Sequence, residues 1–338
     1  MPLAMTLHQF GLGRLRMEHR ASEPLGATMV RMAVKAASLN YRDVLVMRGT
    51  YGPGVALPLI PGSDSAGVVL EVGQAVTDLQ VGERVCSHMV PDWHDGRLEP
   101  HMRLTTLGGP ADGVLCEERV LPRMAVLPIP ETLSLEGAAC LPVAGLTAWS
   151  ALTTGVSIGP GSRVLILGTG GVSMMGLQIA KALGAQVAVT SSSDAKLQRV
   201  EAFGADYTVN YRREPWAEKV RQWSEGGVDV VLEVGGSGTF DHSVRATRDG
   251  GCIALLGVLA QQACAVNLTE VLMRRIRVQG IFVGSRVEFE HYLRFVATHG
   301  MQPVIDRVFE GLATTRQAFA HLLMAQHVGK VVIGLAPE

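Results

Sequence analysis

Residues 163–185, RVLILGTGGVSMMGLQIAKALGA, constrain the fold of this chain more than any other segment. An apolar run ends at Gly168, and a helical pattern of apolar residues opens at Gly170 and Gly171. A glycine at the first position permits a tight turn, and one at the second lets an anion approach the positive end of the helix. We therefore expect a buried strand, a phosphate-binding turn and a helix in direct succession.

The segments after this turn repeat the same alternation. Helical patterns such as DAKLQRVEAFG lie between further apolar runs, which are QVAVTSS, DYTVNY, VDVVLEVGG, CIALLGV and RVQGIFVG. Runs nearly continuous in Val, Ile and Leu are typical of parallel strands that helices cover on both faces. The pattern predicts an α/β fold with a doubly wound parallel sheet of six strands.

The remainder of the chain is organised differently. Residues 27–127 contain short β-rich runs separated by glycine and proline, as in YGPGVALPLIPGS, which is typical of strands joined by turns. A helical pattern opens at Ser134 and places a domain boundary near residue 131. The segments from Ser285 onward end in a strand, KVVIGL, and we assign them to the first domain. We expect two domains, residues 1–130 with 285–338 and residues 131–284.

The turn also matches the G-x-G-x-x-G fingerprint of dinucleotide-binding proteins, except that Ser173 replaces the third glycine. Serine is small enough for the helix to stay close to the strand. The alternative is a plain strand-to-helix turn, but the alternating elements around it favour the dinucleotide. We expect the pyrophosphate at the turn residues Gly168, Thr169, Gly170, Gly171 and Val172.

The end of the second strand, VAVTSSSDAK, indicates which dinucleotide binds. An acidic residue about twenty positions after the motif would bind the ribose hydroxyls and repel a 2′-phosphate. Thr190 stands there, Lys196 follows one helical turn later, and the hydroxyl donors between them are Ser191, Ser192 and Ser193. These residues favour NADP(H) over NAD(H). Asp194 is the counter-argument, because it would contact the ribose in a shifted register; otherwise we expect it to cap the next helix.

Composition excludes several classes of function. With 30 Lys and Arg against 31 Asp and Glu, the net charge of −1 gives no broad positive field for nucleic acid. The longest nearly unbroken apolar run, Cys252 to Ala260, is shorter than the roughly 18 residues of a membrane-spanning helix. The five cysteines lie far apart, and the first twenty residues have no secretory pattern. We expect a cytoplasmic protein with reduced thiols.

Several motifs give the chain a resemblance to a known family: SLNYRDVLVMRGTY, PLIPGSDSAGVVLEVG, LPVAGLTAW and the TGGV turn. Together they resemble the medium-chain dehydrogenase/reductase superfamily, and particularly its zinc-free, quinone-oxidoreductase-like members. The resemblance covers nearly the whole chain. It implies a GroES-like β-barrel as the catalytic domain and a Rossmann fold as the dinucleotide-binding domain.

Zinc-dependent members of the superfamily bind a catalytic zinc ion through a cysteine, a histidine and a further cysteine or acid. In this chain Asn40, Ser63 and Ala144 align with those positions, and these side chains do not bind zinc tightly. The second, structural zinc site would need four clustered cysteines. Its segment offers only Cys116 with His88, His94 and His101, whose spacing matches no common zinc pattern. We therefore expect no metal in either site.

Without a metal, the reaction that best suits such a site is hydride transfer from NADPH to quinones or α,β-unsaturated carbonyl compounds. The negative charge that develops on the carbonyl oxygen of these substrates needs only hydrogen-bond donors. Asn40 would lie near the nicotinamide and the carbonyl, and Tyr51 would border the substrate and donate a hydrogen bond or proton. A turn-stabilising asparagine and a packing tyrosine are the alternatives. Arg42 and Asp43 are expected to form an orienting ion pair. Further cofactor contacts are expected at Thr147, Tyr211, Gly257, Val258, Val283, Gly284 and Ser285.

Two other functions stay open. One is a dehydrogenase that acts on alcohols or aldehydes through side-chain acid–base chemistry, and the other is a catalytically silent NADP-binding redox sensor. Glu233 ends an apolar strand, but a carboxylate would repel pyrophosphate, so we assign it no role. Members of the superfamily commonly pair their Rossmann sheets edge to edge, and the apolar strand RVQGIFVG suits such pairing. We expect a homodimer.

Overall fold

A computed structural model describes residues 1–338 except 53, 258–265, 267 and 336–338. The chain forms two compact units, unit 1 being Met1–Leu146 with Ser285–Glu338 and unit 2 being Thr147–Gly284. Each unit has its own sheet and hydrophobic core. Among the described residues, no helix is both long and apolar enough to cross a membrane.

Unit 2 is built on a parallel sheet that has six strands in the described part of the chain, in the spatial order β10-β9-β8-β11-β12-β13. The strands are β8 (Arg163–Leu167), β9 (Gln186–Ser191), β10 (Tyr207–Asn210), β11 (Val228–Glu233), β12 (Thr247–Leu255) and β13 (Arg277–Gly280). The chain begins at the centre, adds two strands outward, and returns to add three on the other side. This is the order of a Rossmann sheet, where ligands bind at the carboxyl ends of the strands near the reversal. The predicted fold class is confirmed.

Helices pack on both faces of this sheet because its strands are apolar on both sides. One face carries Leu165, which lies in a buried cluster with Trp216 and Val244. On the other face Gly176 packs so closely that an added Cβ would lie 2.5 Å from Leu232 Cδ2. The helices are α3 (Leu146–Thr153), α4 (Gly171–Ala182), α5 (Asp194–Ala202), α6 (Trp216–Trp223), α7 (Phe240–Ala246) and α8 (Leu268–Met273).

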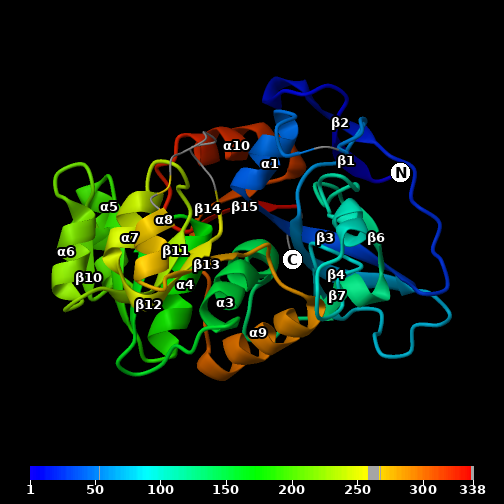
Figure 1. The fold of residues 1–338 in the computed structure, drawn as a ribbon. Coiled ribbons are helices and arrows are strands. Elements are labelled where there is room, and N and C mark those ends of the chain that lie inside the picture. The colour runs from blue at the N-terminus through cyan, green and yellow to red at the C-terminus, as the bar shows by residue number, and fades with distance from the viewer. Residues whose placement is uncertain (53, 258–265, 267, 336–338) are drawn as a thin grey trace. The chain divides into compact units, whose positions relative to one another are not determined.

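Unit 1 is β-dominated, as expected. Its main sheet runs β14-β15-β3-β4-β5-β7, with β6 also paired to β3, and β1 and β2 form a separate pair. The closing strand β15 lies antiparallel to β3 and pairs Val331 with Leu39, so two distant parts of the sequence are neighbours (Figure 1). The strands are β1 (Leu3–Leu7), β2 (Leu15–His19), β3 (Met29–Leu39), β4 (Asp64–Val72), β5 (Arg84–Ser87), β6 (Glu118–Pro122), β7 (Val126–Pro128), β14 (Ile305–Glu310) and β15 (Lys330–Gly334).

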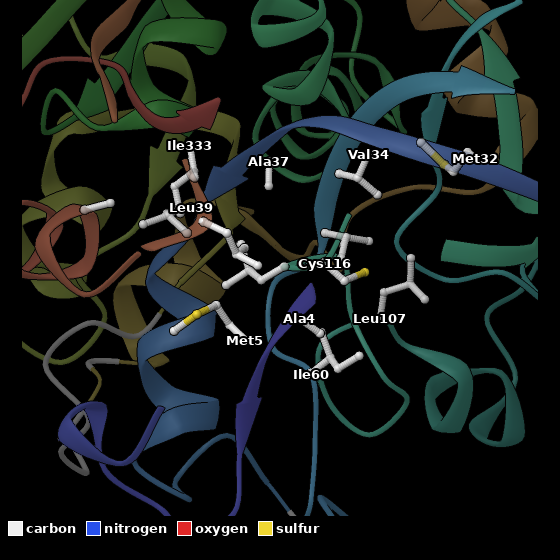
Figure 2. Close-up of a cluster of buried hydrophobic side chains, with 14 of the residues drawn as sticks. Ala4, Met5, Met32, Val34, Ala37, Leu39, Ile60, Leu107, Cys116 and Ile333 are labelled. Carbon is white, nitrogen blue, oxygen red and sulfur yellow. The ribbon is translucent and has the colours of Figure 1, made fainter. Parts of the chain in front are cut away.

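The core of unit 1 joins its first and last segments. Figure 2 shows Met5 of β1, Leu39 of β3 and Ile333 of β15 around one apolar interior, with Ile60 and Cys116 from the connecting segments. Burial of these side chains helps to hold the C-terminal strand on the N-terminal domain. The assignment of residues 285–338 to the first domain agrees with this packing.

The helices of unit 1 include a segment that we expected in the other domain. Helix α2 begins after Ser134, whose Oγ accepts from the N–H of Gly137 at 3.0 Å, as the sequence predicts. However, α2 packs on β3, β4 and β5, and Ser38 Oγ donates to the carbonyl of Ala139 at 2.8 Å. The boundary therefore follows Leu146 instead of lying near residue 131. The helices and helical turns are α1 (Tyr41–Met47), α2 (Leu135–Ala139), α9 (Arg286–His299), α10 (Thr315–Leu323), η1 (Leu12–Arg14), η2 (Pro100–Thr105), η3 (Arg123–Ala125), η4 (Leu141–Gly145) and η5 (Leu312–Thr314).

Two local expectations are wrong. Ser193, not Asp194, is the N-cap of α5, because its Oγ accepts from the N–H of Lys196. The last strand of unit 2 ends at Gly280, short of the expected Gly284. Val283 has a φ of 49°, and this left-handed conformation cannot continue an extended strand.

Candidate functional site

The turn between β8 and α4 has the geometry of an anion site. Gly168 has a φ of 76°, which favours glycine, and its N–H donates to the carbonyl of Thr190 at 2.9 Å. Gly170 is the N-cap of α4, with ordinary extended angles and no side-chain cap. An added Cβ at Gly170 would meet nothing within 4 Å. A ligand can therefore come close to the first turn of the helix, where free N–H groups favour an anion such as a pyrophosphate.

Ser173 fills the place of the third glycine without separating helix and strand. Its side chain is buried, and Oγ donates to the carbonyl of Leu167 at 2.8 Å. This hydrogen bond ties the first turn of α4 to the last residue of β8. The departure from the fingerprint thus keeps the helix close to the strand.

The carboxyl end of β9 brings the predicted specificity residues together. Thr190 and Ser191 are buried, whereas Ser192 and Lys196 are partly exposed. Pairing of β9 with β10 places Tyr211 beside this end, with its N–H donating to the carbonyl of Ser191 at 3.1 Å. The Tyr211 ring is 46% exposed and is therefore accessible to a ligand.

Asp194 lies at the same end but is already paired. Its carboxylate accepts from Asn210 Nδ2 at 2.5 Å and forms an ion pair with Arg213 Nη1 at 2.5 Å. These partners offset its negative charge. The acid is therefore held by β10 and the segment after it, instead of capping its own helix.

The other expected cofactor residues occupy varied environments. Thr147 and Thr169 are buried, Val172 is partly buried, and Gly257 donates to the carbonyl of Glu233 at 3.3 Å. Val283 and Gly284 follow the end of β13 in unit 2, while Ser285 belongs to unit 1 and caps α9 through a bond from the N–H of Glu288 at 3.2 Å. Val258 lies outside the described residues.

Glu233, which we left without a role, organises the loop after β11. The side chain is fully buried, and Oε1 accepts from the N–H of Gly235 at 2.7 Å, the N–H of Gly236 at 3.0 Å and Thr239 Oγ1 at 2.6 Å. Ser243 Oγ donates to Oε2. The signal available in the sequence was an acid followed closely by two glycines, a threonine and a serine.

In unit 1, Asn40 stands where β3 passes into α1. Its backbone N–H donates to Asp43 Oδ2 at 2.8 Å, so that Asp43 closes the first turn of the helix. The side chain is fixed at both ends. Lys330 Nζ donates to Oδ1 at 2.6 Å, and Nδ2 donates to Asp64 Oδ2 at 2.9 Å. The second Nδ2 hydrogen has only a long contact, 3.4 Å, with Ser63 Oγ.

Lys330 and Asp64 were not predicted. Both are buried, at 2% and 0% exposed, and their charged atoms lie 3.5 Å apart. Lys330 comes from β15 and reaches Asn40 because β15 pairs with β3. The sequence did hold a signal for this pair, a lysine at the start of the apolar closing strand. A lysine that is buried with such a strand needs charged or polar partners.

Arg42 and Asp43 form the expected ion pair, with 3.1 Å between Nη1 and Oδ1. Arg42 also donates to the carbonyls of Leu107 and Gly109, each at 3.0 Å, and its guanidinium lies 4.5 Å from the ring centre of Tyr51. Arg42 therefore holds Tyr51 and the 107–109 segment against α1.

The cluster is charge-balanced. Burial raises the pKa of the Asp43 and Asp64 carboxyls above their ordinary values, and Arg42 and Lys330 act in the opposite direction. Two carboxylates thus face two cations in a buried setting. Asp64 Oδ1 has no hydrogen-bond partner among the described residues, so this carboxylate depends on Asn40, Ser38 and Lys330 through its other oxygen.

The residues at the zinc positions do not fit zinc. Asn40 and Ser63 are neighbours, as the alignment implies, but the Asn40 oxygen that would face a metal already bonds the Lys330 ammonium. Ala144 has no donor atom. Within the described ranges, no three His, Cys, Asp or Glu side chains are grouped to hold a metal ion. His88 is buried with Nδ1 bonded at 2.8 Å to the carbonyl of Val90, while His94 and His101 are exposed.

Comparison with known proteins agrees with this architecture. Residues 26–131 match the alcohol dehydrogenase GroES-like domain and residues 171–298 the zinc-binding dehydrogenase domain. A zinc-type alcohol dehydrogenase-like protein of Schizosaccharomyces pombe is 37% identical, over 94% of this chain and 93% of its own length. A quinone oxidoreductase-like protein 2 homolog of Nematostella vectensis is 29% identical, over 93% and 83%. A solved structure from Sinorhizobium meliloti, described as a candidate alcohol dehydrogenase, has a TM-score of 0.93 and 38% identity, with 99% and 98% covered.

Proposed function

The chain belongs to the medium-chain dehydrogenase/reductase superfamily of oxidoreductases, and from this premise we propose that it is an NADPH-dependent reductase of quinones or α,β-unsaturated carbonyl compounds that works without zinc. The observation that carries the proposal is the Asn40 amide, which occupies a zinc-ligand position and is held between Lys330 and Asp64. An amide fixed in this way can donate a hydrogen bond to an oxygen that gains negative charge.

Unit 2 supports the choice of cofactor. Gly168 and Gly170 leave room for a pyrophosphate at the start of α4. Beyond β9, the hydroxyls of Ser191 and Ser192 and the ammonium of Lys196 are the groups that bind a 2′-phosphate. The one acid nearby, Asp194, is paired with Arg213, so that its charge opposes a phosphate less than a free carboxylate would. These features favour NADP(H).

The residues of unit 1 support the choice of substrate. When bound, a reduced nicotinamide supplies a hydride, which carries two electrons to the electrophilic carbon of the substrate. The substrate oxygen then gains negative charge, and uptake of one proton completes a two-electron reduction. Asn40 Nδ2 donates its second hydrogen to that oxygen, and Tyr51, held by Arg42, supplies the proton. A carbonyl conjugated to a double bond or a ring suits such assistance, because its negative charge is delocalised.

Alcohol oxidation is the second candidate, because the S. pombe relative carries an alcohol dehydrogenase name. Without a metal, an alcohol would have to lose its proton to a side chain with a matching pKa. Asn40 and Ser63 cannot act as that base, and Tyr51 could do so only as its phenolate. The geometry of the cluster therefore favours reduction of a conjugated carbonyl.

The deciding experiment is a panel of cofactors and substrates. Oxidation of NADPH and of NADH is followed at 340 nm with benzoquinone, 2-cyclohexenone and a simple aldehyde, and the reverse reaction is followed with ethanol. We expect turnover of the quinone or enone with preference for NADPH. Preference for NADH, or activity on the aldehyde or alcohol alone, contradicts the proposal. Elemental analysis of the purified protein should give no stoichiometric zinc, and one equivalent would refute the metal-free site.

We also propose a homodimer formed through unit 2. Strand β13 lies at the edge of the sheet, with Val278 42% exposed. The adjacent helix α8 exposes Leu268, Leu272 and Met273, each by more than 70%. Exposed apolar residues beside an unpaired edge are typical of a surface that another chain covers. Light scattering should give twice the chain mass, and Val278→Lys should reduce it to the monomer mass; a monomeric wild type contradicts this proposal.

A cytoplasmic location remains our proposal. Four described cysteines, Cys86, Cys116, Cys140 and Cys252, are free and buried, which fits a reducing compartment. Fractionation of the producing cells with fluorescence-tagged protein tests it, and recovery in a secreted fraction would contradict it.

A further inference from the structure

The ammonium group of Lys330 is bound at the Asn40 site. The side chain is buried, and Nζ donates to Asn40 Oδ1 at 2.6 Å, to the carbonyl of Leu39 at 2.9 Å and to Asp64 Oδ2 at 3.5 Å. Burying a lysine is costly unless it is paired and hydrogen-bonded. The fold meets that cost by pairing β15 with β3, which places the ammonium beside the residue that would contact the substrate.

These contacts determine which way the Asn40 amide points. An ammonium can only donate, and a carboxylate can only accept. The end of the amide that faces Lys330 must therefore be the oxygen, and the end that faces Asp64 must be the nitrogen. The second Nδ2 hydrogen is then left with only the long contact of 3.4 Å to Ser63 Oγ, which a substrate oxygen would replace.

The ammonium also changes the strength of the amide as a donor. A positive charge bonded to Oδ1 draws electron density from the nitrogen, so the N–H bonds become better hydrogen-bond donors. The short distance of 2.6 Å between Lys330 Nζ and Oδ1 is typical of a charge-assisted hydrogen bond. The effect grows in surroundings of low dielectric constant, and Lys330 itself is buried, at 2% exposed.

We propose that Lys330 is a positioning residue that orients and polarises the Asn40 amide, so that an internal cation assists the developing oxyanion where other members of the superfamily use zinc. The inference rests on the proposed function, because it names how Asn40 is prepared for the substrate oxygen. It also accounts for the poor fit of zinc. The charges of Asp43 and Asp64 are already balanced by Arg42 and Lys330, and a further divalent cation would be repelled by the ammonium.

The test compares three variants of the full-length protein. Lys330→Met removes the cation and keeps the length of the side chain. Asp64→Asn combined with Lys330→Met removes both charges, so no unpaired buried carboxylate remains, and this double variant keeps the test valid if the single variant does not fold. Lys181→Met is the matched control, because Lys181 forms an ion pair with Asp206 at 2.7 Å within unit 2 and makes no recorded bond to the Asn40 cluster.

The kinetic readout separates polarisation from a structural role. We expect kcat for 2-cyclohexenone to fall about tenfold or more in both Lys330 variants, which corresponds to the loss of one charge-assisted donor. The dissociation constant of NADPH, measured by fluorescence, should stay within twofold. The loss should be smaller for benzoquinone, which is the stronger electrophile and needs less assistance. Lys181→Met should match the wild type in each measurement. Unchanged kcat in a folded Lys330 variant, or equal losses for both substrates, overturns the proposal.

A second readout does not depend on turnover. The chain has asparagine only at positions 40, 210 and 267, so selective ¹⁵N labelling gives three side-chain amide pairs, with a fourth where Asp64→Asn is present, and an Asn40→Ser variant identifies that of Asn40. We expect its N–H resonances to move upfield in both Lys330 variants while those of Asn210, which donates to Asp194, stay in place. An Asn40 amide pair that does not move refutes the inference even if the enzyme reduces enones. If the wild type reduces no quinone or enone but the amide shifts as expected, the proposed function fails and the Lys330–Asn40 coupling stands.

Discussion

Gly170 offers a way to test the nucleotide site without disturbing the fold. In the free protein its φ and ψ are −77° and −172°, which any residue adopts, and an added Cβ would meet nothing within 4 Å. The substitution Gly170→Ala therefore places a methyl group in empty space. That space is where we expect the pyrophosphate to approach the first turn of α4.

The effect on stability should be close to zero. Alanine is a poorer N-cap than glycine by about 0.5–1 kcal/mol. Replacing glycine also restricts the unfolded chain, which stabilises the folded state by about 0.4–1 kcal/mol where the backbone angles are compatible. The two contributions nearly cancel, so we expect the melting temperature to change by less than about 2 °C.

The effect on nucleotide binding should be large. A methyl group in front of the helix N-terminus keeps the pyrophosphate from one or two backbone N–H groups, and each charge-assisted hydrogen bond contributes about 1.5–3 kcal/mol. Since 1.4 kcal/mol corresponds to a factor of ten, the dissociation constant of NADPH should rise about tenfold to a hundredfold. Protein fluorescence quenching or isothermal titration calorimetry measures this change directly.

Gly168→Ala is the matched comparison. Gly168 has a φ of 76°, and an added Cβ would lie 3.8 Å from Ser173 Oγ, an ordinary contact. This variant is strained by its backbone alone, by about 1–2 kcal/mol, and should lower the melting temperature. If Gly170→Ala binds NADPH as tightly as the wild type, or loses as much stability as Gly168→Ala, the placement of the pyrophosphate is wrong.

Three further experiments test other parts of the structure. Ser191→Asp should weaken NADPH binding at least about tenfold and NADH binding less, because the new carboxylate repels only the 2′-phosphate; equal titration curves for NADPH before and after would argue against this pocket. Burial raises the pKa of Cys116 and Cys140 to about 12 from 9.0, so both thiols should resist iodoacetamide at pH 8 in the native protein. As the pH rises, the thiols of the unfolded protein lose their protons before those of the folded protein, so the free energy of unfolding should fall between pH 9 and 12. Denaturant titrations that show no fall in this range would contradict the burial. Glu233→Gln should lower the free energy of unfolding by about 2–3 kcal/mol in urea, since the amide turns a donor toward groups that need an acceptor, and an unchanged midpoint would contradict this role.

The Rossmann unit was the more predictable of the two because its signals are local. The strand, the glycine turn and the helix around Gly168 lie within one short segment, and near-continuous apolar runs show that both faces of the sheet are covered. The helix start at Ser134 was also predictable, since a cap depends on only a few neighbouring residues. The domain boundary was not, because helix α2 is held in unit 1 by packing on β3 and β4, which no pattern within α2 reveals.

The polar cluster of unit 1 shows the opposite case. Asn40 and the ion pair between Arg42 and Asp43 lie in one motif and were found from it. Lys330 and Asp64 were missed because their significance depends on strand pairing. Only the register of β15 against β3, and of β3 against β4, brings both beside Asn40. A lysine read in isolation at the start of a strand is ordinarily a surface residue.

Because strand pairing gathers four buried charged side chains around Asn40, a change in one of them affects the others. Asp43, Asp64, Arg42 and Lys330 are each buried, and removing one charge from a buried pair leaves its partner uncompensated at a cost of about 3–5 kcal/mol. Asn40 and Ser63, at the positions that we align with zinc ligands, therefore lie within a coupled set of buried charges. The surrounding groups, two carboxyls and two basic side chains, hold one amide between them. We expect that a metal site here would need both the missing ligands and the removal of Lys330, because the ammonium that now bonds Asn40 Oδ1 would repel a divalent cation.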